Sequence, residues 1–357
     1  MNSKESDFHL LFINDTILKG GVKALIACGL FSKDSETRDQ AFWAIGNIAV
    51  DCEQCRSKVR QSGALNALTA LFQKPDFMSS KHKRNTIWAL SQIVRGGIQP
   101  LLRGVSIALF QGLHKILCME DPLLRTDATW SIAYITENVI NGGGEVETIL
   151  QTPNLVRRLI ELLYDDEAMH PALLALGNLV TGEEDDTQRV LNAGLLSHLV
   201  RLYRTKEGSN IFRCEIIWIL SNIAAGSQAQ VDLLFGIDDI DKILIEGISS
   251  NDSRMKKECS WTIVNALRNA SVQRLEWLCC TCLPSAIPVI FAFTKERYLI
   301  ERALFAIENI LVEKRNYLPA FQQLGIINCV RSIESDANSS IGFFAKVFES
   351  NFLLPEM

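Results

Sequence analysis

Apolar residues recur along this chain at intervals of three and four residues, the spacing of one face of an α-helix. Clear examples are Ala64–Phe72 (ALNALTALF), Leu155–Tyr164 (LVRRLIELLY) and Leu195–Tyr203 (LLSHLVRLY). Their apolar positions follow i, i+3, i+4 and i+7, which is typical of a helix with one buried face. No segment alternates apolar and polar residues with a period of two, as a half-buried strand would. The pattern therefore predicts an all-α protein.

A second, longer period is set by seven similar segments. They begin at Trp43 (WAIGN), Trp88 (WALSQ), Trp130 (WSIAY), Leu174 (LALGN), Trp218 (WILSN), Trp261 (WTIVN) and Phe305 (FAIEN). Successive starts are 45, 42, 44, 44, 43 and 44 residues apart. In the clearest repeats, a stretch ending in Gly (Gly63, Gly194) is followed by an apolar helix and then by a polar turn that leads into the next segment. Such near-constant phase indicates internal repeats.

Repeats of 42–45 residues with two long helices and one shorter helix are typical of armadillo/HEAT solenoids. One repeat cannot bury its apolar face alone, so stacked neighbours build a continuous core. We predict one domain over residues 1–357, a right-handed superhelical armadillo solenoid of about eight repeats. Their approximate bounds are 8–50, 51–95, 96–140, 141–181, 182–225, 226–268, 269–312 and 313–357, the last being a capping repeat.

Composition narrows the classes of function. The 357 residues are 48% hydrophobic, which excludes an intrinsically disordered chain. The formal net charge is -5, whereas a general nucleic-acid binder needs a basic surface to displace counterions from phosphates. The acidic balance favours basic partners instead.

The ends and apolar runs of the chain indicate a protein of the cytosol or nucleus. Met1–Leu11 is polar, so no secretory signal is predicted. The longest uncharged run, Trp277–Thr294, contains Pro284 and Pro288, which predicts two short buried helices rather than a membrane span. The chain has ten cysteines, and without a signal they are expected to be reduced thiols.

Cysteine spacing gives no complete catalytic or metal-binding pattern. Cys52-x-x-Cys55 is half of a metal or redox motif, with no second pair at zinc spacing. Cys279, Cys280 and Cys282 lie in an apolar, Pro-containing segment. We expect ordinary helical thiols in both places, no metal, no cofactor and no enzymatic activity.

The segments at Trp218 and Trp261 carry a repeated trio of polar and aromatic residues. Glu215 and Asn222 flank Trp218 at i-3 and i+4, and Glu258 and Asn265 flank Trp261 in the same way. On a helix each trio shares one face, and stacking would set the trios in parallel rows on the concave surface. Asn can hold a peptide backbone, indoles can pack the stem of Lys or Arg, and the acid can neutralise its charge. The rows predict a groove for an extended Lys/Arg-rich peptide.

Two structural alternatives must be weighed against this groove. A single Trp at helical spacing is more often part of a core. An Asn ladder could also serve purely to link neighbouring repeats, which would predict the Asn residues without the acids. Because Asn is a poor residue for a helix interior and recurs here together with acids, we favour the peptide groove.

The same segments resemble the importin-α (karyopherin-α) family, the adaptor receptors for nuclear localisation signals. The resemblance rests on WAIGNIAVD, RNTIWALSQ, DATWSIAYIT, PALLALGNLVTG, EIIWILSNIAAG and KKECSWTIVN, in unbroken order between Leu18 and Phe352. It includes the aberrant third segment, with Tyr134 in place of Asn, and the fourth, which lacks Trp. The resemblance implies binding of basic nuclear localisation signals, a role in protein import and shuttling between nucleus and cytoplasm.

The resemblance also implies two peptide sites in the groove. For the minor site it implies Asn178, Val180, Thr187, Glu215, Trp218, Asn222, Glu258, Trp261 and Asn265. For a partial major site it implies Trp43, Asn47, Asp51, Asn85, Trp88, Gln92, Asp127 and Trp130, Gln92 standing where the family has Asn.

The sequence departs from the family at its start, where no basic importin-β-binding segment and no first Trp–Asn pair precede Trp43. We therefore expect a weakened major site. The resemblance implies importin-β as a partner and an export receptor at the C-terminal repeats, and the absent basic segment argues against direct binding of importin-β. The sequence leaves open whether this is a natural variant or part of a longer receptor. The alternative function is a cytoplasmic armadillo scaffold for another extended peptide, and the acids Glu215 and Glu258 argue against it.

Overall fold

A computed structural model describes residues 20–73, 78–137, 145–205, 210–281, 283–294, 296–333 and 340–352. The predicted start of the first repeat, residues 8–19, lies outside this range, as does Cys282. Throughout the described segments the chain forms helices joined by turns, with no strand, so the all-α prediction is confirmed.

The chain divides into two compact units, of which unit 1 ends at Ala193 and unit 2 begins at Gly194. The prediction of one domain stays a prediction. Unit 1 contains α2 (Gly21–Phe31), α3 (Ser35–Asp51), α4 (Glu53–Gln61), α5 (Ala64–Phe72), α6 (Ser80–Val94), α7 (Arg103–Leu117), α8 (Pro122–Thr136), α9 (Glu145–Gln151), α10 (Leu155–Glu161), η3 (Leu162–Tyr164), α11 (Met169–Leu179) and α12 (Glu184–Asn192). Unit 2 contains α13 (Leu195–Thr205), α14 (Asn210–Ala224), α15 (Gln228–Leu234), α16 (Ile240–Ser249), α17 (Ser253–Asn269), α18 (Val272–Cys280), η4 (Leu283–Ser285), α19 (Ala286–Phe293), α20 (Arg297–Glu313), η5 (Arg315–Tyr317), α21 (Leu318–Gln323), α22 (Ile326–Ile333) and α23 (Ser340–Phe352).

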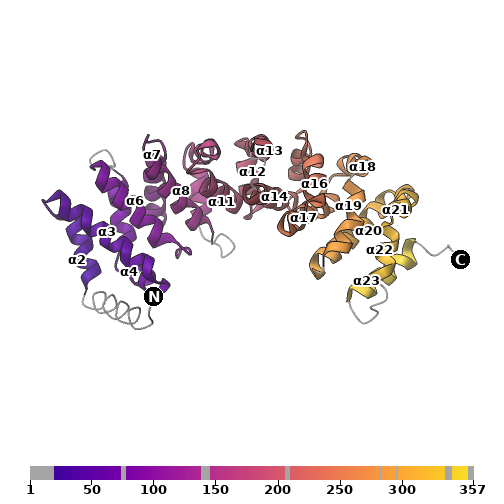
Figure 1. Cartoon of the computed structure of the whole chain (residues 1–357), viewed down its shortest axis with the longest axis horizontal. Coiled ribbons are helices and arrows are strands. Elements are labelled where there is room, and N and C mark those ends of the chain that lie inside the picture. The colour runs from indigo at the N-terminus through magenta and orange to yellow at the C-terminus, as the bar shows by residue number, and fades with distance from the viewer. Residues whose placement is uncertain are drawn as a thin grey trace. The chain divides into compact units, whose positions relative to one another are not determined.

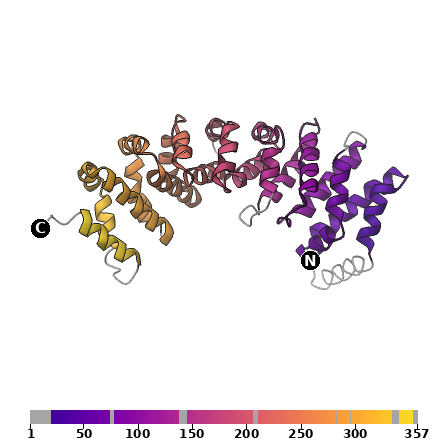
Figure 2. The same ribbon diagram turned by 180° about the vertical axis from the view of Figure 1, so that it is seen from behind.

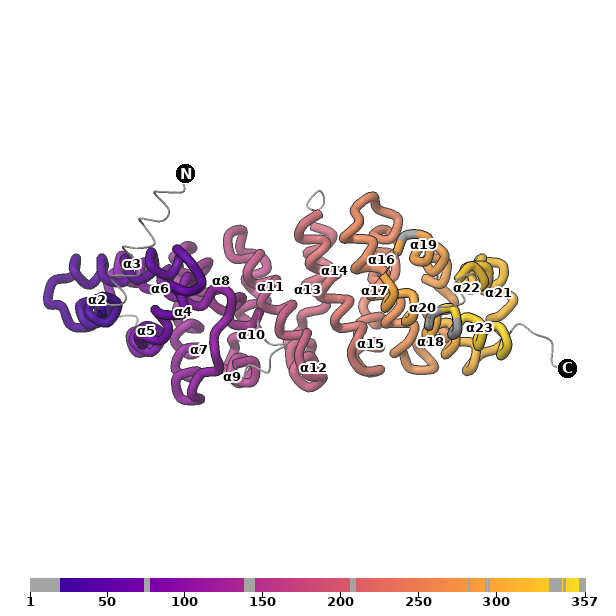
Figure 3. The backbone as a smooth tube through the Cα atoms, turned by 90° about the horizontal axis from the view of Figure 1, so that it is seen from below, coloured from indigo at the N-terminus to yellow at the C-terminus, as the bar shows by residue number. Residues whose placement is uncertain are grey.

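The seven repeated segments all lie on helices, which we call the anchor helices: α3, α6, α8 and α11 in unit 1, and α14, α17 and α20 in unit 2. Within each unit, successive anchor helices pack side by side (Figures 1 and 2). Seen from below, the intervening helices, such as α4, α5 and α7 in unit 1, lie beside this row (Figure 3). The repeated sequence segments thus become neighbouring helices of one layer in each unit.

Local sequence signals explain where the anchor helices begin. The side chain of Asp34 accepts a hydrogen bond from the Thr37 backbone N–H at 2.7 Å, and Asp252 caps α17 in the same way. Such caps satisfy backbone donors that the first helical turn leaves unpaired, and each stabilises by about 1 kcal/mol. Gly63 (φ 88°) and Gly194 (φ 95°) supply the positive φ predicted at the turns between helices.

The core lies between the anchor helices and the helices beside them. Phe42 and Ile45 of α3 and Ile87 and Leu90 of α6 are fully buried. Burying one such side chain stabilises the fold by about 1.5–3 kcal/mol. Stacking therefore supplies the buried apolar surface that a single repeat lacks. The face of an anchor helix that points away from this core carries polar and aromatic side chains, such as Trp43 and Asn47 of α3.

The described residues of the uncharged run at Trp277–Thr294 form the end of α18, the short helix η4 and α19, so the run is divided into short helices, in which Trp277 and Val289 are exposed rather than buried. No single helix among the described residues is long and apolar enough to cross a membrane. One pair bent by 68°, Val272–Cys280 with Leu283–Ala292, passes that test jointly on length and composition.

Candidate functional site

A cavity of about 370 Å³ in unit 2 contains the repeated trio residues predicted to bind a peptide. It is lined by Trp218, Ser221, Asn222, Ala225, Glu258, Trp261, Asn265 and Arg302. These residues come from the neighbouring anchor helices α14, α17 and α20. Five of them, Trp218, Asn222, Glu258, Trp261 and Asn265, were predicted from the sequence, because positions i-3, i and i+4 share one helix face. We call this cavity the unit 2 groove.

Glu258 is the acid that faces the Trp218 end of the unit 2 groove. Its Oε2 lies 3.3 Å from the Ser221 hydroxyl, which also donates to the backbone oxygen of Trp218 at 2.8 Å. Burial raises the pKa of Glu258, while the Ser221 hydroxyl and the charge of Lys257 lower it. A buried carboxyl that is only partly compensated gains from a cation placed beside it. By contrast, Glu215 is buried on α14 and does not line the cavity.

The two Asn residues of the unit 2 groove differ in their partners. Asn222 Nδ2 is buried and, within the described part of the chain, makes no hydrogen bond. Asn265 Nδ2 donates to the backbone oxygen of Ser221 at 3.4 Å, and its Oδ1 accepts from Arg302 at 3.0 Å. An unpaired buried donor costs about 1–3 kcal/mol, which a ligand carbonyl would recover. Asn222 is therefore free to bind a ligand, whereas Asn265 links repeats.

In unit 1 the predicted major-site residues lie on α3 and α6. Trp43 is half exposed, and Asn47 and Asp51 are exposed on the same helix. Trp88 is partly buried because its ring packs against Gly46, where a Cβ atom would come within 2.3 Å of Cζ3.

The amides of α6 are already engaged within unit 1. Asn85 Nδ2 donates to the backbone oxygen of Asp39 at 3.1 Å, and Gln92 Nε2 donates to the Ser91 hydroxyl at 3.1 Å. Asn85 thus joins α6 to α3. In Asn85 the structure thus shows the alternative role considered from the sequence, in which an Asn side chain links neighbouring repeats instead of binding a peptide.

The third anchor helix, α8, presents an acid and a covered indole. Burial raises the pKa of the Asp127 carboxyl to about 6. Trp130 stacks on Tyr134 with 5.3 Å between ring centroids, and the His170 ring meets its edge at 5.5 Å. Tyr134, which stands where other anchors have Asn, therefore occupies a face of Trp130 that a ligand would need.

The minor-site residues predicted at the end of unit 1 bind each other and α8. Asn178 Nδ2 donates to the Ala133 backbone oxygen at 3.3 Å and to the Thr136 hydroxyl at 3.2 Å. The Thr187 hydroxyl donates to the Val180 backbone oxygen at 3.3 Å. Asn178 thus links two repeats, as Asn85 and Asn265 do.

A second cavity, of about 500 Å³, lies in unit 1 away from all predicted site residues. It is bounded by α4, the start of α5 and residues 96–101, with Glu53 and Arg60 among its lining. Arg60 reaches the backbone oxygens of Ile93 and Gly97 at 2.9 and 3.2 Å. Arg60 thus uses its hydrogen bonds within unit 1, and no sequence motif predicted this cavity.

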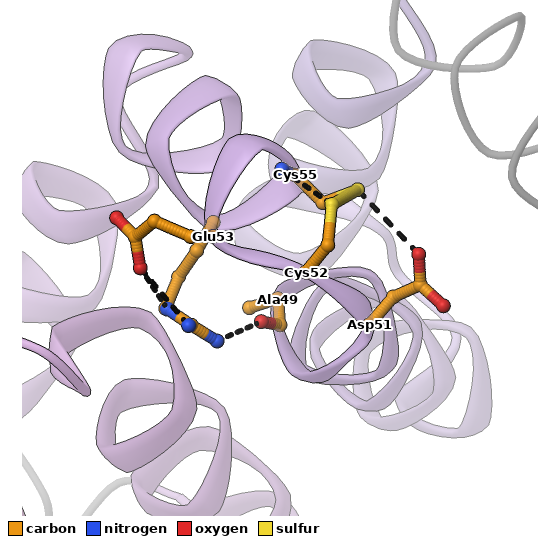
Figure 4. Close-up of a disulfide and its surroundings, with 6 residues drawn as sticks. Ala49, Asp51, Cys52, Glu53 and Cys55 are labelled. Carbon is orange, nitrogen blue, oxygen red and sulfur yellow. Dashed lines mark hydrogen bonds and ion pairs between the residues drawn. A yellow bond between two sulfur atoms is a disulfide. The ribbon is translucent and has the colours of Figure 1, made fainter.

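The expectation of reduced thiols is wrong for Cys52 and Cys55, which the structure joins as a disulfide (Figure 4). Cys52 has an extended backbone at the turn from α3 to α4, and Cys55 lies in the first turn of α4, with 5.2 Å between their Cα atoms. That distance suits a disulfide. Asp51 Oδ2 lies 3.6 Å from Cys55 Sγ, so three potential metal ligands gather here, although bonded sulfurs cannot act as thiolate ligands.

The stacked helical repeats define an armadillo-repeat protein. An engineered protein of known structure superimposes with a TM-score of 0.70 at 18% identity, covering 96% of this chain and 91% of that one. A designed armadillo repeat protein solved in complex with the peptide (KR)4 gives a TM-score of 0.58 at 22% identity, over 69% of this chain and 99% of that one. These likenesses confirm the armadillo fold.

The sequence relatives are importin-α subunits, which confirms the resemblance seen in the anchor segments. Importin subunit alpha-1b of Oryza sativa subsp. japonica is 31% identical over 204 residues, 57% of this chain and 37% of that subunit. Importin subunit alpha-8 of Arabidopsis thaliana is 27% identical over 276 residues, 77% of this chain and 60% of that subunit. The chain thus spans less than two thirds of these relatives. No protein-family model matches it.

Proposed function

We propose that this chain binds Lys/Arg-rich nuclear localisation signals as an importin-α-like adaptor and that the unit 2 groove is a binding surface for them. One observation carries the proposal: the cavity combines two Trp side chains, the unpaired amide donor of Asn222 and the partly buried carboxyl of Glu258. A peptide carbonyl matches the donor, and a Lys or Arg side chain matches the indoles and the acid.

The relatives support the wider role. Importin-α similarity over much of the chain favours a part in nuclear import and shuttling between nucleus and cytoplasm. The designed armadillo protein that was solved with (KR)4 supports an extended basic ligand for this fold. The role requires peptide binding and no catalytic step. Binding of importin-β or an export receptor stays a prediction from the resemblance.

The test is fluorescence anisotropy with a labelled peptide carrying two Lys/Arg clusters. We expect micromolar or tighter binding, equivalent to about -8 kcal/mol, that the double variant Trp218→Ala/Trp261→Ala weakens at least tenfold. Trp277→Ala is the matched control, because Trp277 is an exposed indole of α18 outside the groove. Circular dichroism checks that each variant is folded.

The alternative is an armadillo scaffold for a different extended peptide, and an acidic peptide of the same length tests it. Preference for the basic peptide supports the proposal. Tighter binding of the acidic peptide, or no binding of the basic peptide to the intact chain, would sink it.

A further inference from the structure

One residue of the unit 2 groove breaks the charge pattern of its repeats. The residue three positions before the anchor is Glu215 in α14 and Glu258 in α17, but it is Arg302 in α20. Arg302 lines the cavity together with Glu258. A cation therefore occupies the place where the two preceding repeats carry an acid.

The residue at this position reaches back to the preceding anchor helix. Glu258 of α17 lies beside Ser221 of α14, at 3.3 Å. In the same way, Arg302 of α20 donates to Asn265 Oδ1 of α17 at 3.0 Å, and its guanidinium carbon lies 5.9 Å from the centroid of the Trp261 ring. Each of these two charged residues thus contacts the anchor helix before its own: the acid Glu258 at Ser221 of α14, and the cation Arg302 at Asn265 and Trp261 of α17.

The two charges do not neutralise each other. The charges that most affect Glu258 are those of Lys257, Arg254 and Glu296. For Arg302, burial and the positive charge of Arg268 lower the pKa. No carboxylate among the described residues forms an ion pair with Arg302. A partly buried guanidinium in this setting gains from an anion.

We propose that the unit 2 groove reads a peptide of mixed charge, with Lys or Arg at the Trp218–Glu258 end and the carboxylate of Asp or Glu at the Trp261–Arg302 end. This inference rests on the proposed function and sharpens its ligand. A second basic side chain at the Trp261 end would meet a guanidinium that already covers the indole and holds Asn265. The carboxylate can accept charge-assisted hydrogen bonds from Arg302 instead.

The experiment uses an octapeptide of alternating Lys and Arg and eight derivatives, each with one cation replaced by Glu. Binding is measured by anisotropy to the full chain carrying Trp43→Ala/Trp88→Ala, so that unit 2 dominates. We expect Glu to weaken binding at most positions but to strengthen it about threefold to tenfold at one position or two adjacent ones. Equal weakening at all eight positions would overturn the inference.

Two substitutions of Arg302 separate a recognition role from a structural one. Arg302→Gln keeps a donor for Asn265 but should abolish the preferred Glu position. Arg302→Glu supplies the acid that α14 and α17 carry at this position and should make the all-basic peptide bind about threefold to tenfold more tightly. Arg297→Glu is the control, since this exposed residue of α20 gives the same change of charge outside the cavity.

The outcomes distinguish the inference from the proposed function. If the all-basic peptide binds through Trp218 and Trp261 but Arg302→Glu weakens it or acts like Arg297→Glu, the mixed-charge inference fails alone. If no peptide binds even in the absence of the Trp43 and Trp88 substitutions, the proposed function fails as well.

Discussion

At the scale of single residues, burial decides how the acids of this protein behave. Glu258 and Asp127 both stand on anchor helices, and burial raises the pKa of each carboxyl. A carboxyl in such a place is held at a cost while it is charged, and a bound cation removes part of that cost. The burial that makes these charged carboxyls costly in the free protein therefore favours binding of a basic ligand.

Asp127→Asn should stabilise the protein, and the gain should depend on pH. The pKa of Asp127 is about 6 in the folded protein against 3.8 for an ordinary Asp, so between these values the folded protein binds more protons than the unfolded chain. Its contribution to stability is largest at low pH and is lost as the pH rises through 6. We expect Asp127→Asn to raise the free energy of unfolding by about 1–2 kcal/mol at pH 7.5 and to have little effect near pH 4.

Urea unfolding of wild type and variant across this pH range measures the difference. Asp185→Asn, at an exposed acid of α12, is the control and should show no such trend. A gain from Asp127→Asn that is constant with pH would mean that the buried charge is not its cause.

At the scale of elements, the sequence predicted where the anchor helices lie along the chain but few of the contacts between their side chains. The 42–45-residue phase placed every anchor on a helix, because stacked repeats must present the same face at the same position. It could not show that Tyr134 stacks on Trp130, since that depends on rotamers. Nor could it show that Arg302 reaches Asn265, which depends on the spacing between α17 and α20.

Contacts between repeats were the part that sequence reasoning missed. Asp39 of α3 and His82 of α6 are both buried, with 2.8 Å between Oδ1 and Nδ1, although neither belongs to a motif. The two residues are 43 positions apart, close to the repeat length, and that offset is the signal that could have suggested the pair. The disulfide between Cys52 and Cys55 was missed because no secretory signal was predicted, and reduced thiols were therefore expected.

Gly46→Ala tests the packing of two anchor helices. The new Cβ atom would lie 2.3 Å from Cζ3 of Trp88, so the indole must move. Overpacking of this kind costs about 1–3 kcal/mol, whereas the exchange of Gly for Ala inside a helix gains about 1 kcal/mol. We expect a net loss of stability and a changed tryptophan emission spectrum, measured by chemical denaturation and fluorescence. Gly104→Ala, at a helical glycine with open space around it, should lose no stability, and the same outcome for both variants would contradict the packing argument.

At the scale of the whole molecule, the two units offer a basic peptide different surfaces. In unit 1, Trp88 packs on Gly46, Asn85 is held by Asp39, and Trp130 is covered by Tyr134. In unit 2, Trp218 and Trp261 line one cavity, in which Arg302 lies over the Trp261 ring. The binding energy of a peptide should therefore be unevenly divided between the units.

The division can be measured by comparing two double variants with one bipartite basic peptide in isothermal titration calorimetry. Trp218 packs a cation, which contributes about 0.5–2 kcal/mol, and Trp261 supports the Arg302 guanidinium at the other end of the groove, so Trp218→Ala/Trp261→Ala should weaken binding at least tenfold. Trp43→Ala/Trp88→Ala should weaken it less than about threefold, because Trp88 and its neighbours already use their contacts within unit 1. Equal losses would show that the contacts inside unit 1 yield to the ligand. In that case the half-exposed Trp43, and not the unit 2 groove alone, would determine which peptides this protein selects.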